Sequence, residues 1–214
     1  MSAIPQLGFT VLDAEPLRHA AAPTLSFAIA IESSGVTDVR SLLLDVQLQI
    51  GARRRHYDEA AQERLFELFG PVDAWGATLR NLLWARTTLV VPPFEGSTVV
   101  DLHVPCTYDL DVAASRYFDA LVDGEVPLEL LFSGTAFYTA DDGRLQTARI
   151  PWDREAEHRL PVSVWRATMD QHFPGSAWLR VDHEAFARLA AFRSRHALPS
   201  WEAALDALLE AREA

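Results

Sequence analysis

Lysine is absent from this chain of 214 residues, so all 19 of its basic residues are arginines. Schiff-base catalysis, a lysine general base and the phosphate-binding lysine of P-loops are therefore excluded for this chain. Cysteine occurs once, as Cys106, which excludes an internal disulfide and a multi-thiolate metal site within one chain. A single thiol suits a reducing compartment, and we expect a cytoplasmic location.

Long apolar runs and excess positive charge are also missing. No stretch approaches the roughly 18 apolar residues of a membrane helix, so we expect no membrane insertion. The first residues show no basic region followed by an apolar stretch, so we expect no secretory signal. The net charge of −11 repels phosphate backbones, and we expect no nucleic-acid partner. No glycine-rich phosphate loop, nucleophile elbow or zinc-binding helix motif is present in the sequence, so we expect no cofactor.

What the chain does contain is the alternating pattern of half-buried strands. The clearest example is 40–51, where Leu42, Leu44, Val46, Leu48 and Ile50 alternate with polar residues. One face of such a strand meets a core and the other meets water, as antiparallel sheets allow. Further strands are predicted over 7–12, 24–32, 83–91, 97–104, 126–138 and 145–150, with a hairpin turn at Asp141-Asp142-Gly143.

Helical patterns interrupt the strands and then replace them. Two helices are predicted within the strand region, at about 58–69 and 111–121, and three after it, at 162–172, 185–196 and 201–212. We therefore predict an α+β fold with an antiparallel β-sheet or β-sandwich core, inserted helices and a helical C-terminal segment. Residues 1–150 would form the β-rich part, and residues 151–214 would be helical and pack on it as one structural unit.

Cys106 is the one candidate nucleophile of the thiol type. His103 precedes it by three residues and Asp109 follows by three. A reactive thiolate needs a nearby imidazole or helix N-terminus, whereas the carboxylates of Asp109 and Asp111 would raise the pKa of the thiol. His103 and Cys106 are only two metal ligands, and the other histidines are scattered, so we expect no metal site. The pattern favours a small, partly buried thiol, and a Cys106-dependent enzyme is the remote alternative.

Arg53-Arg54-Arg55-His56 is the only dense basic cluster of this acidic chain. It stands where a strand ends and a helix begins, so its guanidinium groups are candidates for binding a phosphate or carboxylate. The neighbouring acidic residues Asp58, Glu59 and Glu63 offer the alternative of salt bridges on a solvated face.

Tryptophan is plentiful, with six residues, of which Trp152, Trp165, Trp178 and Trp201 lie in the last third. Tryptophan is enriched at the energetic centres of protein interfaces. Its bulky side chain can also fill the space between a helical layer and a sheet. Both interpretations stay open from the sequence, and Trp152 and Trp165 are the candidate contact residues.

The whole chain resembles an uncharacterised bacterial family of about this length that is classed as a domain of unknown function. The resemblance is carried by Arg53-Arg54-Arg55, Leu68-Phe69-Gly70, Phe94-Glu95-Gly96-Ser97-Thr98, Val104-Pro105-Cys106-Thr107-Tyr108-Asp109, Asp123-Gly124-Glu125-Val126-Pro127-Leu128, Leu131-Phe132-Ser133-Gly134-Thr135, Pro151-Trp152-Asp153 and Leu160-Pro161-Val162. It implies no catalytic residues. It implies that members are often encoded near genes of uptake nickel–iron hydrogenases, which suggests an accessory role toward that enzyme.

A weaker likeness concerns SecB-type chaperones. The spacing of Cys106, Ala114, Tyr117-Phe118-Asp119-Ala120-Leu121, Gly124 and Pro127-Leu128 is similar to a helix and the following Gly–Pro stretch of those proteins. Long antiparallel strands precede both. The inserted helix, the hairpin at 126–150 and the helical tail depart from that pattern, so the likeness concerns the fold level alone.

The leading hypothesis is a non-enzymatic accessory or chaperone-like module that binds another protein, with a hydrogenase subunit or maturation factor as the expected partner. Self-association into a homo-oligomer is left open. The alternative, which belongs to a different class of function, is a small-molecule or anion-binding domain that uses Arg53, Arg54 and Arg55.

Overall fold

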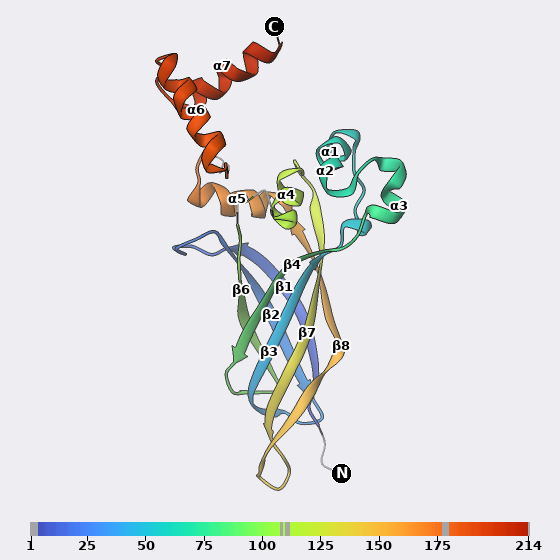
Figure 1. The fold of residues 1–214 in the computed structure, drawn as a ribbon. Helices are drawn as coiled ribbons and strands as arrows, with labels where there is room; N and C mark the ends of the chain where they lie inside the picture. The colour runs from blue at the N-terminus through green and yellow to red at the C-terminus, as the bar shows by residue number, and fades with distance from the viewer. Residues whose placement is uncertain (1–3, 108, 110–111, 177–179, 214) are drawn as a thin grey trace. The chain divides into compact units, whose positions relative to one another are not determined.

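The computed structural model describes residues 4–107, 109, 112–176 and 180–213 (Figure 1). The chain divides into two compact units, Met1–Ala177 and Trp178–Ala214. The predicted helix start at Asp111 and one of the six tryptophans, Trp178, lie outside the described residues. The first unit holds all the strands, and the second is helical within its described part.

A three-stranded antiparallel sheet forms one layer of the first unit. It consists of β1 (Gln6–Pro16), β2 (Thr24–Ser34) and β6 (Ser97–Pro105), with β2 in the centre. In β2, Phe27, Ile29 and Ile31 are fully buried and alternate with small or polar residues, as the sequence predicts. The period of two therefore sets which face of this sheet meets the core.

A five-stranded antiparallel sheet forms the other layer. Its strands are β3 (Asp38–Ile50), β4 (Leu82–Val91), β5 (Phe94–Glu95), β7 (Glu125–Thr139) and β8 (Leu145–Pro161). Their order is β4-β3-β7-β8, and the short β5 pairs with β3. All pairings are antiparallel, which confirms the predicted sheet type.

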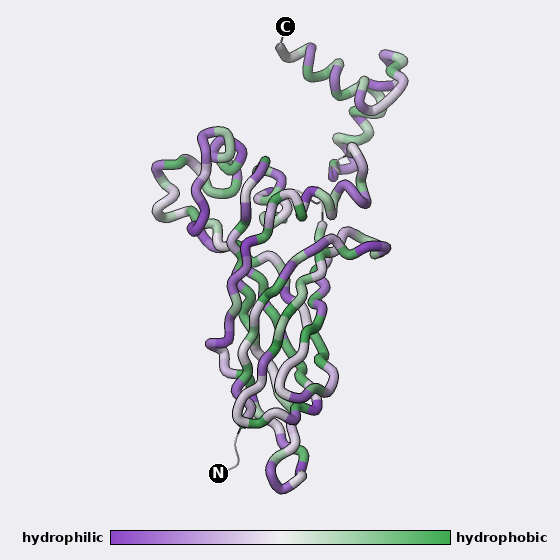
Figure 2. The backbone as a smooth tube through the Cα atoms, turned by 180° about the vertical axis from the view of Figure 1, so that it is seen from behind, coloured by the Kyte–Doolittle hydropathy of each residue, from purple (hydrophilic) through white to green (hydrophobic). Residues whose placement is uncertain are grey.

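The core lies between the inner faces of the two sheets. The rings of Phe9 on β1 and Phe132 on β7 stack with centroids 4.2 Å apart and an interplanar angle of 7°. Hydrophobic residues of both sheets belong to one buried cluster, and Figure 2 shows green and purple alternating along the strands. The fold is therefore α+β with a two-layer β-core, which resolves the choice between a sandwich and a single curved sheet.

Short helices gather at one end of the strands (Figure 1). They are η1 (Ala52–Arg54), α1 (Glu59–Arg64), α2 (Phe66–Phe69), η2 (Val72–Ala74), α3 (Trp75–Thr78), α4 (Ala113–Asp119) and α5 (Val162–His172). The predicted helix 58–69 is present as α1 and α2, with the Asp58 carboxylate accepting a hydrogen bond from the Ala61 backbone N–H. The predicted helix 111–121 is present as α4. The turns η2 and α3 were not predicted.

Buried aromatic rings tie this helical layer to the strand ends. The Tyr57 hydroxyl donates to the Ala52 carbonyl at 2.7 Å, and the hydroxyls of Tyr57 and Tyr117 lie 2.6 Å apart. Desolvation raises the pKa of both phenols. The rings of Phe118 on α4 and Trp165 on α5 stack at 4.4 Å. The layer is therefore held by packed aromatic side chains whose buried hydroxyls are hydrogen-bonded.

The predicted boundary at 150/151 is wrong. Strand β8 continues through Pro151 to Pro161, so the segment 151–214 is not helical throughout, and the division between units falls after Ala177. The buried positions of this strand extension include Ala156 and Leu160, but charged residues occupy the exposed positions. A strand with so weak an apolar pattern is stabilised by pairing with β7, which the sequence does not display.

Candidate functional site

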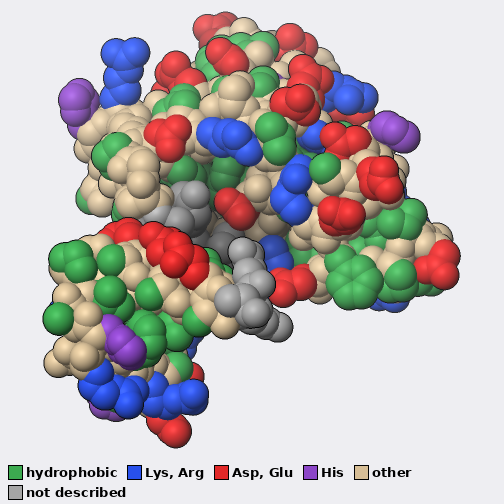
Figure 3. Space-filling view, turned by 90° about the horizontal axis from the view of Figure 1, so that it is seen from above, with side chains coloured by type: hydrophobic (Ala, Val, Ile, Leu, Met, Phe, Trp, Pro, Cys, Tyr) green, Lys and Arg blue, Asp and Glu red, His purple; other side chains and the backbone are tan. Residues whose placement is uncertain are grey.

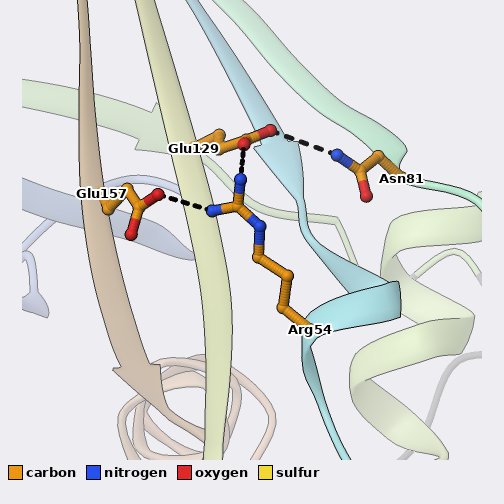
Figure 4. A network of polar contacts seen from close by, with 4 residues as sticks. All are labelled: Arg54, Asn81, Glu129 and Glu157. Atoms are coloured by element: carbon orange, nitrogen blue, oxygen red, sulfur yellow. Dashed lines mark hydrogen bonds and ion pairs between the residues drawn. The ribbon is translucent and has the colours of Figure 1, made fainter.

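Arg54 lies at the end of η1, just after the longest alternating strand of the sequence analysis. Its guanidinium group makes an ion pair with Glu129 on β7 and another, at 2.7 Å, with Glu157 on β8 (Figure 4). The Asn81 side-chain amide donates to the second oxygen of Glu129 at 3.1 Å. Arg54 therefore joins the end of β3 to two neighbouring strands of the same sheet.

Arg53 and Arg55 point to other partners. The Arg53 Nε donates to the Leu79 carbonyl at 2.5 Å. The Arg55 guanidinium donates to the carbonyls of Asp123 and Glu125, at 2.6 and 2.8 Å. The three arginines thus hold separate chain segments together.

The arginine cluster does not form a converging anion site in this structure. Arg53 and Arg54 line an open depression with Arg80 and Asn81, but the Arg54 donors already face two carboxylates, which repel an added anion. The His56 side chain is exposed. The recorded partners of Arg54 come from distant strands rather than from the adjacent helix, so the salt bridges predicted with Asp58, Glu59 and Glu63 are replaced by these.

Cys106 is a buried thiol at the end of β6. Its Sγ lies 3.4 Å from the Val104 carbonyl oxygen, to which it donates, and desolvation raises the pKa of the thiol to about 12. His103 lies on the exposed face of the same strand, while Val104 faces the core. A thiol that stays protonated at neutral pH is not an activated nucleophile.

Alkylation should reveal this protection directly. At pH 8 we expect iodoacetamide to modify Cys106 in the folded chain at least about a hundredfold more slowly than in urea, because the thiolate reacts and burial disfavours it. Mass spectrometry of timed samples measures both rates. Raising the pH toward 12 should accelerate the reaction while the chain stays folded. Equal rates in buffer and urea would show that the thiol is accessible.

The described part of the chain offers neither a cluster of metal ligands nor a membrane-spanning helix. No group of three or more His, Cys, Asp or Glu side chains there is placed to hold a metal ion. No helix among the described residues is long and apolar enough to cross a membrane.

The two candidate tryptophans have opposite surroundings. Trp165 is buried on α5, where its ring stacks on Phe118 and meets the edge of Trp84 at 5.9 Å. Trp152 is 89% exposed, in a stretch of β8 where the register with β7 shifts between Phe132 and Gly134. Trp165 is therefore a packing residue, and contact of Trp152 with a partner stays a prediction.

The helical unit carries a surface that the sequence analysis did not single out. It contains α6 (His183–Arg195) and α7 (Trp201–Glu213). The Asp182 carboxylate accepts a hydrogen bond from the Ala185 N–H at the start of α6, and the Ser200 hydroxyl accepts one from the Ala203 N–H at the start of α7. Both helices therefore begin with a side-chain cap.

Within this unit the two helices bury very little. The Trp201 ring meets Phe186 of α6 with centroids 5.3 Å apart, and the Arg193 guanidinium lies over the same ring at 4.0 Å. Of residues 180–211, whose side chains are described, Ala204 is the only buried one. The helical unit therefore has almost no core of its own.

The unburied apolar residues of α7 lie in a row. Leu205, Leu208 and Leu209 are 42%, 42% and 63% exposed, and their spacing of three and four places them on one helix side. We call these three residues the leucine stripe. Helical spacing continues it to Trp201, which contacts Phe186, itself exposed. The helical period was visible in the sequence, and the structure adds how far each leucine of the stripe is exposed.

These features define a two-layer antiparallel β-core with a helical end layer and a separate helical unit that exposes an apolar stripe. The chain belongs to a family of unknown function, DUF6084, whose model matches residues 4–214. That match confirms the resemblance to a domain of unknown function. None of the curated proteins matches the chain.

Solved structures show only distant likeness. The CARDB domain of the PF1109 protein from Pyrococcus furiosus, solved with di-metal ions, is 10% identical over 73% of this chain and 91% of that chain, with a TM-score of 0.29. The putative ApaA protein from Bordetella pertussis is 8% identical over 74% and 93%, with a TM-score of 0.26. A putative late embryogenesis abundant protein is 14% identical over 74% and 73%, with a TM-score of 0.32. TM-scores this low carry no argument about function.

Proposed function

We propose that this chain is a non-enzymatic, chaperone-like accessory protein that binds another protein through the leucine stripe of α7. The observation that carries the proposal is the exposure of Leu205, Leu208 and Leu209 in a unit with a single buried residue among those described at 180–211. Exposed apolar rows on amphipathic helices mark surfaces that pack against a partner.

The size of the helical unit supports this proposal. Two helices of 13 residues each bury too little apolar surface to offset the conformational entropy lost on ordering them. Covering the stripe with a partner removes apolar area from water and stabilises both helices at once. An accessory protein that binds in this way needs no catalytic group of its own.

The proposal also names the partner more specifically. The family resemblance implies genes near those of uptake nickel–iron hydrogenases, so we propose a hydrogenase subunit or maturation factor as the bound protein. We also propose that the chain acts in the cytoplasm, where its single thiol stays reduced.

Affinity capture from the native organism tests this function. The variant L205Q/L209Q removes the apolar row but keeps side chains that favour helices, so the fold is expected to persist. We expect a hydrogenase subunit or maturation factor to be enriched with the unaltered chain and to be reduced at least about tenfold with the variant, as for the loss of two interface anchors. Quantitative mass spectrometry measures the ratio.

The matched control is L12Q/L145Q, because Leu12 and Leu145 are 55% and 66% exposed on the first unit. It removes as many exposed leucines from another surface, so capture should remain. If no hydrogenase component is enriched, the named partner is wrong. If capture is equal for both variants, the leucine stripe is not the binding surface.

A further inference from the structure

Acidic side chains border the leucine stripe along one side. Glu202, Asp206 and Glu210 are four residues apart on α7, and all three are exposed. Glu202 stands three residues before Leu205, and Asp206 stands three before Leu209, so each carboxylate is a surface neighbour of a stripe leucine. We call these three residues the acidic row.

Most of the positive charges of the helical unit lie on α6, and α7 carries one arginine, Arg212, near its end. Arg188, Arg193 and Arg195 belong to α6, and the Arg193 guanidinium is engaged with the Trp201 ring at 4.0 Å. Figure 3 shows the acidic and the arginine side chains of this unit gathered mainly on opposite sides of it, with hydrophobic side chains between them (lower left). Among the described residues, no basic side chain forms an ion pair with the acidic row.

Building on the proposed function, we propose that the leucine stripe and acidic row together bind an amphipathic helix whose apolar side is flanked by arginine or lysine. Leucines at helical spacing accept the apolar side of a second helix, as in helix-in-groove recognition. The acidic row then faces the basic flank of the bound helix. The net charge of −11 also attracts a basic partner over a distance and raises its association rate.

A second copy of the same chain is a poorer fit to this surface. An antiparallel, two-fold packing of two leucine stripes brings the same flank of each α7 together, so the two acidic rows would face each other. Like charges across an interface are unfavourable. Two chains of net charge −11 also repel each other before contact.

Two synthetic peptides of roughly 18 residues serve as probes, since that length forms a helix readily when bound. Both carry leucines at spacings of three and four with alanine between them. One has arginine at the flanking positions and the other has glutamate. Fluorescence anisotropy of the labelled peptides with the full chain should show the arginine peptide binding at least about tenfold more tightly, with an affinity that falls as salt rises.

Two variants with the same change in net charge locate the effect. E202Q/D206N/E210Q neutralises the acidic row, and E63Q/E95Q/E155Q neutralises three exposed carboxylates of the first unit. We expect the first to weaken binding of the arginine peptide at least about tenfold and to flatten its salt dependence, and the second to change it by less than about twofold. Equal effects of both variants would show that overall charge alone explains the attraction, and the inference would be overturned.

Further outcomes separate this inference from the proposed function. If L205Q/L209Q loses the cellular partner but the chain binds neither peptide, the function stands and the partner chemistry is wrong. If light scattering shows a dimer that L205Q/L209Q converts to a monomer, the occupant is a second copy, and the inference is overturned. If L205Q/L209Q lowers the urea midpoint of the chain more than L12Q/L145Q does, the stripe is already buried in the free chain, and both proposals fail.

Discussion

Replacing Gly134 by alanine is expected to lower the free energy of unfolding by about 4 kcal/mol, because two costs combine at this position. Gly134 lies on β7 beside Leu44 of β3 and has a φ of 134°, which side-chain-bearing residues rarely adopt. A Cβ there would stand 2.0 Å from the Leu43 carbonyl oxygen. Since that atom belongs to the backbone of the neighbouring strand, the central pairing of the five-stranded sheet must shift.

Gly143 is the matched control for this change. It has a φ of 77° in the β7–β8 turn, and a Cβ there would meet nothing within 4 Å. G143A therefore carries the backbone cost alone, about 1 kcal/mol. Urea unfolding followed by circular dichroism measures both variants. A G134A protein as stable as G143A would contradict the close approach of β3 and β7 at this point.

The second large effect is expected from Trp165→Ala. This side chain is buried and lies within ring-contact distance of Phe118 and Trp84, so its removal leaves a cavity between α4, α5 and the end of β4. Such truncations typically lower stability by about 3–5 kcal/mol, because both transfer free energy and packing are lost. Urea unfolding gives the value.

Trp152→Ala provides the contrast within the same residue type. Trp152 is 89% exposed, so its removal should change the free energy of unfolding by less than about 0.5 kcal/mol. If W152A keeps its stability but weakens capture of the cellular partner, Trp152 contacts that partner. If W165A proved as mild as W152A, the aromatic layer would not be packed as the structure shows.

The strands were largely predictable because their signal is local. In β3, buried and exposed residues alternate so regularly that the core face follows from the sequence alone. The second half of β8 was not predicted, since charged residues alternate there with only a few apolar ones, Ala156 and Leu160, at the inner positions. Its strand conformation depends on hydrogen bonds to β7, and no local sequence pattern identifies β7 as its partner.

The binding candidates were less predictable because their environment is made by distant segments. Arg53, Arg54 and Arg55 are consecutive, yet their partners lie on other elements, and Glu157 is 103 positions from Arg54. Trp152 and Trp165 look equivalent in the sequence, but in the structure Trp165 is buried and Trp152 is exposed. The spacing of Leu205, Leu208 and Leu209 predicted an amphipathic helix but not the exposed fraction of each leucine.

The sequence by itself determined the antiparallel strands and the exclusion of lysine and disulfide chemistry, because each depends on residue type or on spacing within one segment. Only the tertiary structure decided the two-layer core, the hydrogen-bond and ion-pair partners of the arginines, the burial of Cys106 and the exposure of the leucine stripe. Those properties depend on which segments meet in space. Burial and charge pairing depend on residues that are far apart in the sequence, so a local pattern cannot predict them.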